Sequence, residues 1–176
     1  MRAGRLAAAG LVGLLSGSLL CAPAAAQSSA PGLAISAPSA VSLGSALVGQ
    51  RTLAADLGSV RVTTSAALLG SGAWTATVST TGFRTGGGTP AERVPASAVA
   101  YRSGAATASS GLSLSACTAG QLVAAVDLST PRTAFSCSGF SLLSSTSVTW
   151  NPRITVTISD QNVVGGYSGT IVHSVA

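Results

Sequence analysis

The sequence predicts an all-β fold, an antiparallel β-sandwich of the immunoglobulin-like or Greek-key type, formed as a single domain with one disulfide. Short stretches of alternating apolar and polar residues recur about every ten residues, separated by Gly, Pro and Asn turns. The composition is rich in Val, Thr, Ala, Ser and Gly, which suits thin strands joined by tight turns. Beyond the first residues, no stretch keeps a helical period.

Residues 1–26 have the pattern of a secretory signal peptide. Arg2 and Arg5 precede an apolar stretch, Leu6–Leu20, and Ala24–Ala26 supplies an A-x-A cleavage site. The stretch is too short, and too interrupted by Gly and Ser, for a transmembrane helix. We therefore expect a secreted, extracellular protein at the cell surface, with no membrane span after signal cleavage. An uncleaved anchor is the alternative.

Residues 27–39 are rich in Pro, Ser and Ala and are expected to form a short leader that feeds an edge strand, which leaves 40–176 for the sandwich. The longest loop signal is Arg84–Pro95, and turns are expected at Asn151–Pro152 and Val164–Gly166. On the last strand, alternation places Tyr167, Ile171, His173 and Val175 on one face. The expected strands are Val60–Thr63, Ala73–Ser79, Ala98–Arg102, Leu122–Leu128, Ser147–Trp150, Arg153–Ile158 and Tyr167–Val175.

Cysteine usage agrees with export. Cys21 lies within the signal, and Leu20 before it does not fit a lipid-attachment site. Cys117 and Cys137 then remain as one expected disulfide. A redox or metal-binding pair is the alternative, but there is no C-x-x-C motif and no nearby His.

The charge pattern excludes some classes of partner. After signal removal the chain has seven arginines, four acids and no lysine, a net charge of +3 spread along the sequence. Nucleic-acid binding needs basic stripes with interleaved aromatics, and none is present. The arginines are expected to keep the surface soluble, with a weak attraction to anionic wall polymers or lipid headgroups as the alternative.

The inventory for catalysis is thin, so the chain is predicted not to be an enzyme and to need no cofactor or metal. It has one His, and its acids, Asp56, Glu92, Asp127 and Asp160, are scattered. There is no G-x-S-x-G motif, and no Lys follows the three glycines at 86–88. A hydrolase would require the carboxylates to converge in the fold.

Four residues are the tentative ligand-binding set: Trp74, Trp150, Tyr167 and His173. A strand tryptophan either anchors the core or exposes a ring that stacks on sugars. His173 is either a partly buried core residue or lies beside Tyr167 at a binding surface.

Two motifs resemble the WxL domain of Gram-positive bacterial surfaces. The run Trp74–Val78, ending in Phe83, resembles its first motif, and Tyr167–Val175 resembles its second. Ala76, His173 and Val175 replace the family's Leu, Trp and Leu. The chain is also similar in style to WxL-like secreted proteins of actinobacteria. This resemblance implies a β-sandwich that attaches non-covalently to the cell wall, with peptidoglycan as the ligand.

The sequence therefore predicts a secreted, non-enzymatic cell-surface protein that binds the wall through Trp74 and the Tyr167/His173 region. The second hypothesis is a structural subunit of a surface layer or fibre, with other surface proteins as partners, assembling through strand edges. A wall-directed hydrolase is the third.

Overall fold

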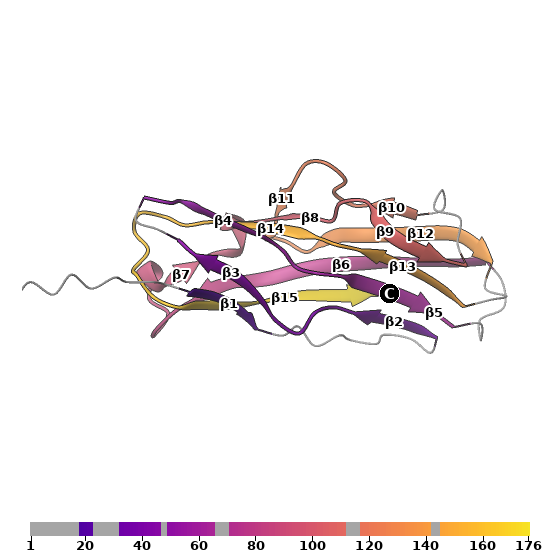
Figure 1. Ribbon diagram of the computed structural model, residues 1–176, viewed down its shortest axis with the longest axis horizontal. Helices are drawn as coiled ribbons and strands as arrows, with labels where there is room; N and C mark the ends of the chain where they lie inside the picture. The colour runs from indigo at the N-terminus through magenta and orange to yellow at the C-terminus, as the bar shows by residue number, and fades with distance from the viewer. Residues whose placement is uncertain (1–17, 23–31, 47–48, 66–70, 112–116, 142–144) are drawn as a thin grey trace, which may run out of the picture.

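The computed structural model describes residues 18–22, 32–46, 49–65, 71–111, 117–141 and 145–176. Over these residues the chain is all-β, without an α-helix, and its strands run along the long axis of an elongated molecule (Figure 1). Two short 3-10 turns, Pro90–Glu92 and Ala96–Ala98, interrupt the strands. The strands are β1 (Ser18–Ala22), β2 (Leu33–Ser36), β3 (Val41–Ser45), β4 (Thr52–Asp56), β5 (Val60–Thr64), β6 (Ser71–Arg84), β7 (Arg93–Val94), β8 (Val99–Arg102), β9 (Ala106–Ser110), β10 (Cys117–Ala119), β11 (Val126–Asp127), β12 (Arg132–Ser141), β13 (Thr146–Trp150), β14 (Arg153–Thr157) and β15 (Tyr167–Val175).

One layer is a seven-stranded sheet in the order β10-β12-β6-β15-β1-β3, with β7 added beside β6. Strand β6 is the longest, and it pairs antiparallel with both β12 and β15. We call this layer the large sheet.

The second layer consists of two four-stranded sheets, β11-β8-β14-β4 and β2-β5-β13-β9. Strands β8, β14 and β4 continue along the chain into or out of β9, β13 and β5, in the same lateral order. The two sheets thus form one layer with an interruption between β13 and β14. Pro152 lies at this interruption, and because it has no backbone N–H it cannot donate a hydrogen bond to a neighbouring strand. The Leu57 amide donates to the Pro152 carbonyl oxygen (2.7 Å) and so closes the break.

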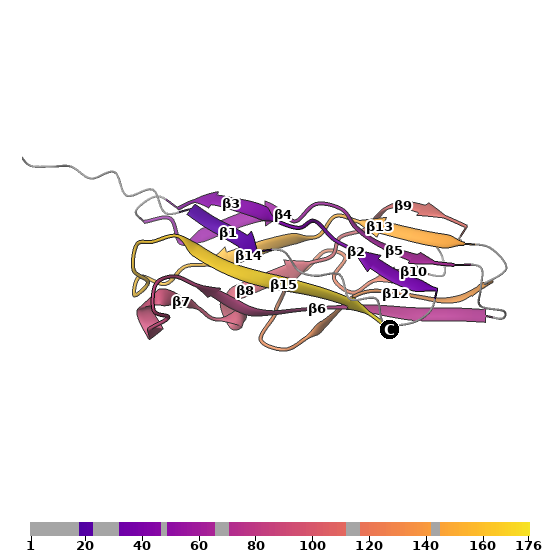
Figure 2. The same cartoon turned by 90° about the horizontal axis from the view of Figure 1, so that it is seen from below.

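The core lies between these layers, as Figure 2 shows with β6 and β15 on one side and β4, β5, β13 and β14 on the other. Period-two alternation builds it, because every second side chain of a strand points inward. On β5, Val60 and Val62 are buried while Arg61 is exposed. On β15, the inward face is Tyr167, Ile171, His173 and Val175, as the sequence predicts.

Strand β1 lies within the predicted signal peptide. It pairs parallel with β15, from Leu19 opposite Tyr167 to Ala22 opposite Thr170, and antiparallel with β3 on its other side. The β1–β15 pair is the one parallel pair among the described strands. Removal of residues 1–26 would therefore open a slot one strand wide between β15 and β3. Strand β2, within the segment expected as a leader, is an edge strand that pairs with β5.

Two predicted segments differ from the structure. Leu122–Leu128 was expected as a strand, but only Val126 and Asp127 form one, and the side chains of Leu122 and Val123 are exposed. The Gln121 amide and the Ser103 hydroxyl hold the preceding bend by reciprocal hydrogen bonds, which turns the chain out of the sheet. The expected loop Arg84–Pro95 contains β7, and Arg84 itself ends β6.

The predicted disulfide is confirmed. Cys117 and Cys137 lie directly opposite each other on β10 and β12, with their Cα atoms 4.0 Å apart. The bond therefore links neighbouring strands of the large sheet and holds β10 at its edge.

Candidate functional site

The four residues predicted to bind a ligand are all buried. The exposed fraction is 3 % for Trp74, 0 % for Trp150, 5 % for Tyr167 and 4 % for His173. Each is on an inward-facing position of its strand, because alternation directs it into the core. These rings line no exposed patch, and stacking on a sugar face would require the sandwich to open.

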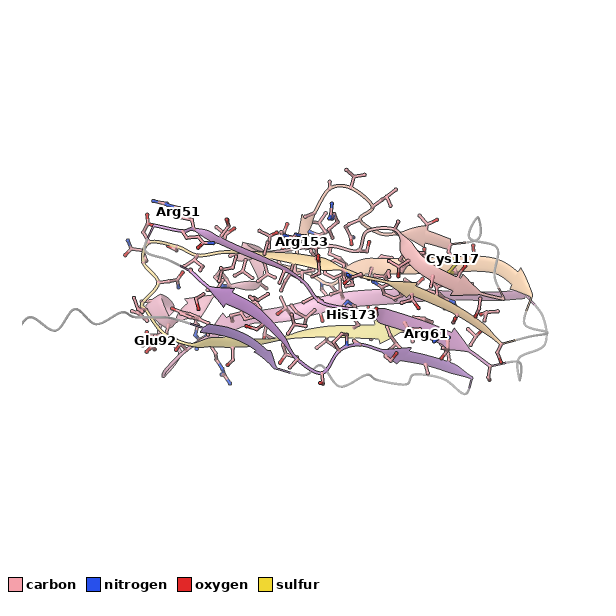
Figure 3. The ribbon with its side chains drawn as sticks, viewed as in Figure 1. Arg51, Arg61, Glu92, Cys117, Arg153 and His173 are labelled. Atoms are coloured by element: carbon pink, nitrogen blue, oxygen red, sulfur yellow. A yellow bond between two sulfur atoms is a disulfide. The ribbon has the colours of Figure 1, made fainter. Side chains whose placement is uncertain are left out.

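Four buried rings, Phe135, Trp150, Tyr101 and His173, form a series of contacts that joins the two layers. Phe135 on β12 stacks on Trp150 on β13, with ring centroids 5.0 Å apart. The Trp150 Nε1–H donates to the Tyr101 hydroxyl oxygen (3.3 Å), and that hydroxyl lies 3.1 Å from His173 Nε2. This series of contacts begins and ends in the large sheet and passes through both four-stranded sheets. It therefore holds the two layers in a fixed relative position (Figure 3, where His173 lies near the centre).

Donor and acceptor roles in this chain follow from its chemistry. Tryptophan can only donate, so the Tyr101 oxygen accepts from Trp150 and its single hydrogen is directed to His173 Nε2. His173 Nε2 is then an acceptor, and the ring is neutral. Burial lowers the pKa of His173 to about 4 and raises that of Tyr101. The network is thus held in one uncharged state near neutral pH.

Tyr167 and Trp74 have different partners. The Tyr167 hydroxyl lies 2.8 Å from the Val163 carbonyl oxygen and 3.2 Å from that of Ala91, and so ties two loops together. Trp74 lies opposite Cys137, and its indole N–H has no hydrogen-bond partner among the described residues. Trp74 therefore contributes apolar packing.

Three of the four carboxylates form separate ion pairs with different arginines. Asp160 pairs with Arg51 (2.7 Å), Asp56 with Arg153 (3.1 Å) and Asp127 with Arg132 (3.5 Å). Figure 3 shows Arg51 and Arg153 apart along the molecule.

Glu92 accepts from the Thr89 amide and hydroxyl, and these hydrogen bonds lower the pKa of its carboxyl group. Among the described residues no group of His, Cys, Asp and Glu is arranged to hold a metal ion. Each acid thus has a local structural partner.

The outward face of the large sheet carries hydroxyl groups in place of acids. Register aligns them across neighbouring strands, as in the rows Thr118–Ser136–Thr75 and Thr133–Thr77–Ser174. The Thr77 and Ser174 hydroxyls are hydrogen-bonded to each other at 2.8 Å. Strands β6, β7, β10, β12 and β15 contain no Asp or Glu. We call the residues Thr75, Thr77, Thr118, Thr133, Ser136 and Ser174 the hydroxyl face.

A basic row lies on the same face, toward one end of the large sheet. Ser168, Arg84 and Arg93 stand directly opposite one another on β15, β6 and β7, and all three are exposed. Their in-register neighbours Phe83 and Val94 are buried, so the two arginines point outward together.

Glycine makes this row possible. Gly82 has a positive φ of 84°, and a Cβ there would overlap the Val94 carbonyl oxygen. Only glycine lets β7 approach β6 so closely. The Arg93 Nε–H donates to the Gly88 carbonyl oxygen, which anchors that guanidinium. In the sequence these arginines look like dispersed surface charge, because eight residues, 85–92, separate them and nothing in that segment indicates that they pair.

The comparisons with known proteins identify no family. No family model and no curated protein matches the chain. Among the described residues, no helix is long and apolar enough to pass through a membrane.

Proposed function

We propose that this chain is exported and that its folded domain is a non-enzymatic component of the bacterial cell surface, associating non-covalently with peptidoglycan. The observation that carries the proposal is the hydroxyl face, a broad outward surface of aligned Ser and Thr without a carboxylate. Glycan strands offer hydroxyl and amide groups that such a face can hydrogen-bond. The signal pattern at 1–26 and the WxL resemblance support the same location.

The burial of the aromatic rings changes how binding would occur. Trp74, Trp150 and Tyr167 are packed in the core, so the contacts with the wall would be polar ones made by the sheet surface. Their role in the proposal is to hold that surface rigid, because a surface that is already ordered loses less conformational freedom when it binds a polymer.

Pull-down on purified peptidoglycan tests the proposal. The protein is the chain from residue 27, and the control protein is another secreted domain of similar size and net charge. We expect enrichment of this domain, weakened several-fold in Thr75→Glu/Thr133→Glu, because both exposed threonines become acidic on the hydroxyl face. The matched control is Thr52→Glu/Thr107→Glu, which places the same charges on exposed threonines of the other layer. Equal retention of wild type and control protein would refute the proposal.

A structural subunit that assembles through strand edges is the second proposal. The specific observation is β9, an exposed edge strand that, among the described strands, pairs only with β13 and contains neither charge nor proline to block pairing with another chain. Size-exclusion chromatography over a wide concentration range tests it, and a monomer throughout would refute it. A hydrolase is disfavoured, because each acid already has its own local partner.

A further inference from the structure

The basic row has an unusual charge arrangement. Arg84 and Arg93 are directly opposite each other on antiparallel strands, where Cβ atoms are about 5 Å apart and like charges destabilise the pair. Among the described residues neither guanidinium has a salt bridge. The acid nearest in sequence, Glu92, directs its carboxylate to Thr89. No carboxylate of the described residues forms an ion pair with Arg84 or Arg93.

A second arginine row in the protein shows the contrast. Arg102 and Arg153 are also directly opposite, on β8 and β14, but the next strand places Asp56 opposite Arg153, with a 3.1 Å ion pair. That row carries its own anion. In the row of Arg84 and Arg93, the corresponding position on β15 is Ser168, a neutral hydrogen-bond donor.

We propose that Arg84, Arg93 and Ser168 form a binding site for a carboxylate group of peptidoglycan stem peptides. Arg84 and Arg93 are directly paired across β6 and β7, so their guanidinium groups could offer paired N–H donors to one oxyanion, and the serine hydroxyl could add a further hydrogen bond. The Gly88 carbonyl oxygen holds Arg93 in place beforehand, so less side-chain freedom is lost on binding. The proposal rests on the proposed function, because it names the group of the wall that the domain recognises.

The site also explains how the two parts of the outward face would act together. The hydroxyl face and the basic row lie on the same side of the large sheet, on strands β6 and β15 that both parts share. Glycan and peptide are adjacent in peptidoglycan, so one face could contact the sugar chain with hydroxyls and the attached peptide with arginines.

Binding to peptidoglycan freed of other wall polymers tests the site. We expect Arg84→Gln/Arg93→Gln to weaken binding by about tenfold or more, the effect of losing charge-assisted hydrogen bonds. The control Arg61→Gln/Arg102→Gln removes the same charge from exposed arginines without breaking a salt bridge of the described residues, and it should bind within about twofold of wild type. Equal losses in both double variants would show a diffuse charge effect and overturn the site.

Two further measurements are needed. The first distinguishes the geometry of the guanidinium groups from their charge, and the second tests binding of the peptide in the absence of the intact wall. Arg84→Lys/Arg93→Lys keeps the charge without the guanidinium fork, and we expect it to lose most of the affinity; full retention would overturn the oxyanion geometry. A stem peptide with free carboxylates should shift the Arg84 and Arg93 Nε–H resonances, and its amidated form should not. Shifts with both peptides, or with neither, would overturn the site. A phosphate-bearing wall polymer that competes better than the peptide would overturn the assignment to carboxylate.

These outcomes distinguish the two proposals. Wild-type protein that binds peptidoglycan while Arg84→Gln/Arg93→Gln binds equally well would remove the site and leave the proposed function. Wild-type protein that fails to bind peptidoglycan, yet whose arginine resonances respond to the carboxylate peptide, would remove the function and leave the site.

Discussion

His173 is expected to make the domain less stable in mild acid. Its ring is buried against the Tyr101 hydroxyl, and burial lowers its pKa from 6.5 to about 4. In the unfolded chain the ring takes up a proton below about pH 6.5, whereas in the folded chain it does so only near pH 4. The unfolded state therefore binds more protons in this window, and stability falls as the pH decreases.

The pKa difference sets the size of the effect. A depression from 6.5 to about 4 corresponds to about 3 kcal/mol of folding free energy lost between neutral pH and pH 4. Glu92 and Asp127 have lowered pKa values, so their contribution is lost only at still lower pH, where unfolded carboxylates take up protons. Between about pH 6.5 and pH 4.5 the histidine should dominate.

Urea unfolding followed by tryptophan fluorescence measures this effect, because both tryptophans are buried. His173→Gln keeps a hydrogen-bond acceptor for Tyr101 and cannot be protonated in this range. The variant should be less stable than wild type at neutral pH and nearly independent of pH down to about pH 4.5. Equal slopes of stability against pH in wild type and variant would refute the reasoning.

Three other predictions concern the core, the slot beside β15 and the disulfide. Trp74→Phe should cost less than about 1 kcal/mol, since the indole N–H has no partner, whereas Trp150→Phe should cost about 1–3 kcal/mol because the Tyr101 hydroxyl loses its donor; urea midpoints with the order reversed would contradict this. Ser42 and Ser168 both lie opposite Leu20, so β1 separates them by two strand spacings, about 10 Å. In the chain from residue 27 we expect β3 to move against β15, so that Ser42→Cys/Ser168→Cys forms a disulfide. The control is the full-length chain with the same two substitutions and Cys21→Ser, in which we expect no such disulfide. Free thiols at both positions in both proteins would show that the slot stays open. Replacing both cysteines of the native disulfide by serine should cost up to about 3 kcal/mol, and an unchanged melting temperature would show that β10 is held by its other contacts.

Periodicity in the sequence was sufficient for some strands and not for others. Strand β15 was predicted over its full length, because apolar residues alternate regularly from Tyr167 to Val175. Strand β12 was not predicted, since register shifts near Thr133 and Ser138 break its alternation. The expected strand at Leu122 was wrong because its apolar residues belong to a loop held by side-chain hydrogen bonds.

The site shows the same limit. The disulfide was predictable because two cysteines remain once the predicted signal peptide is set aside, and the structure confirms their pairing. The contact of His173 with Tyr101 joins positions 72 residues apart, and the pairing of Arg84 with Arg93 depends on how closely Gly82 lets β7 approach. Such contacts follow from tertiary register, which the composition of a segment does not determine.

The position of β15 has a consequence for the order in which the sheet can fold. It is the last described strand in the sequence, yet it lies inside the large sheet, with β6 on one side and β1 on the other. Folding of this sheet must therefore wait until β15 has been synthesised, since its pairings with β6 join residues 84 (Ser168 with Arg84) to 99 (Val175 with Ala76) positions apart. A chain that cannot complete its sheet early stays extended for longer, and this would suit the export proposed above, because an extended polypeptide can be threaded through a translocation channel.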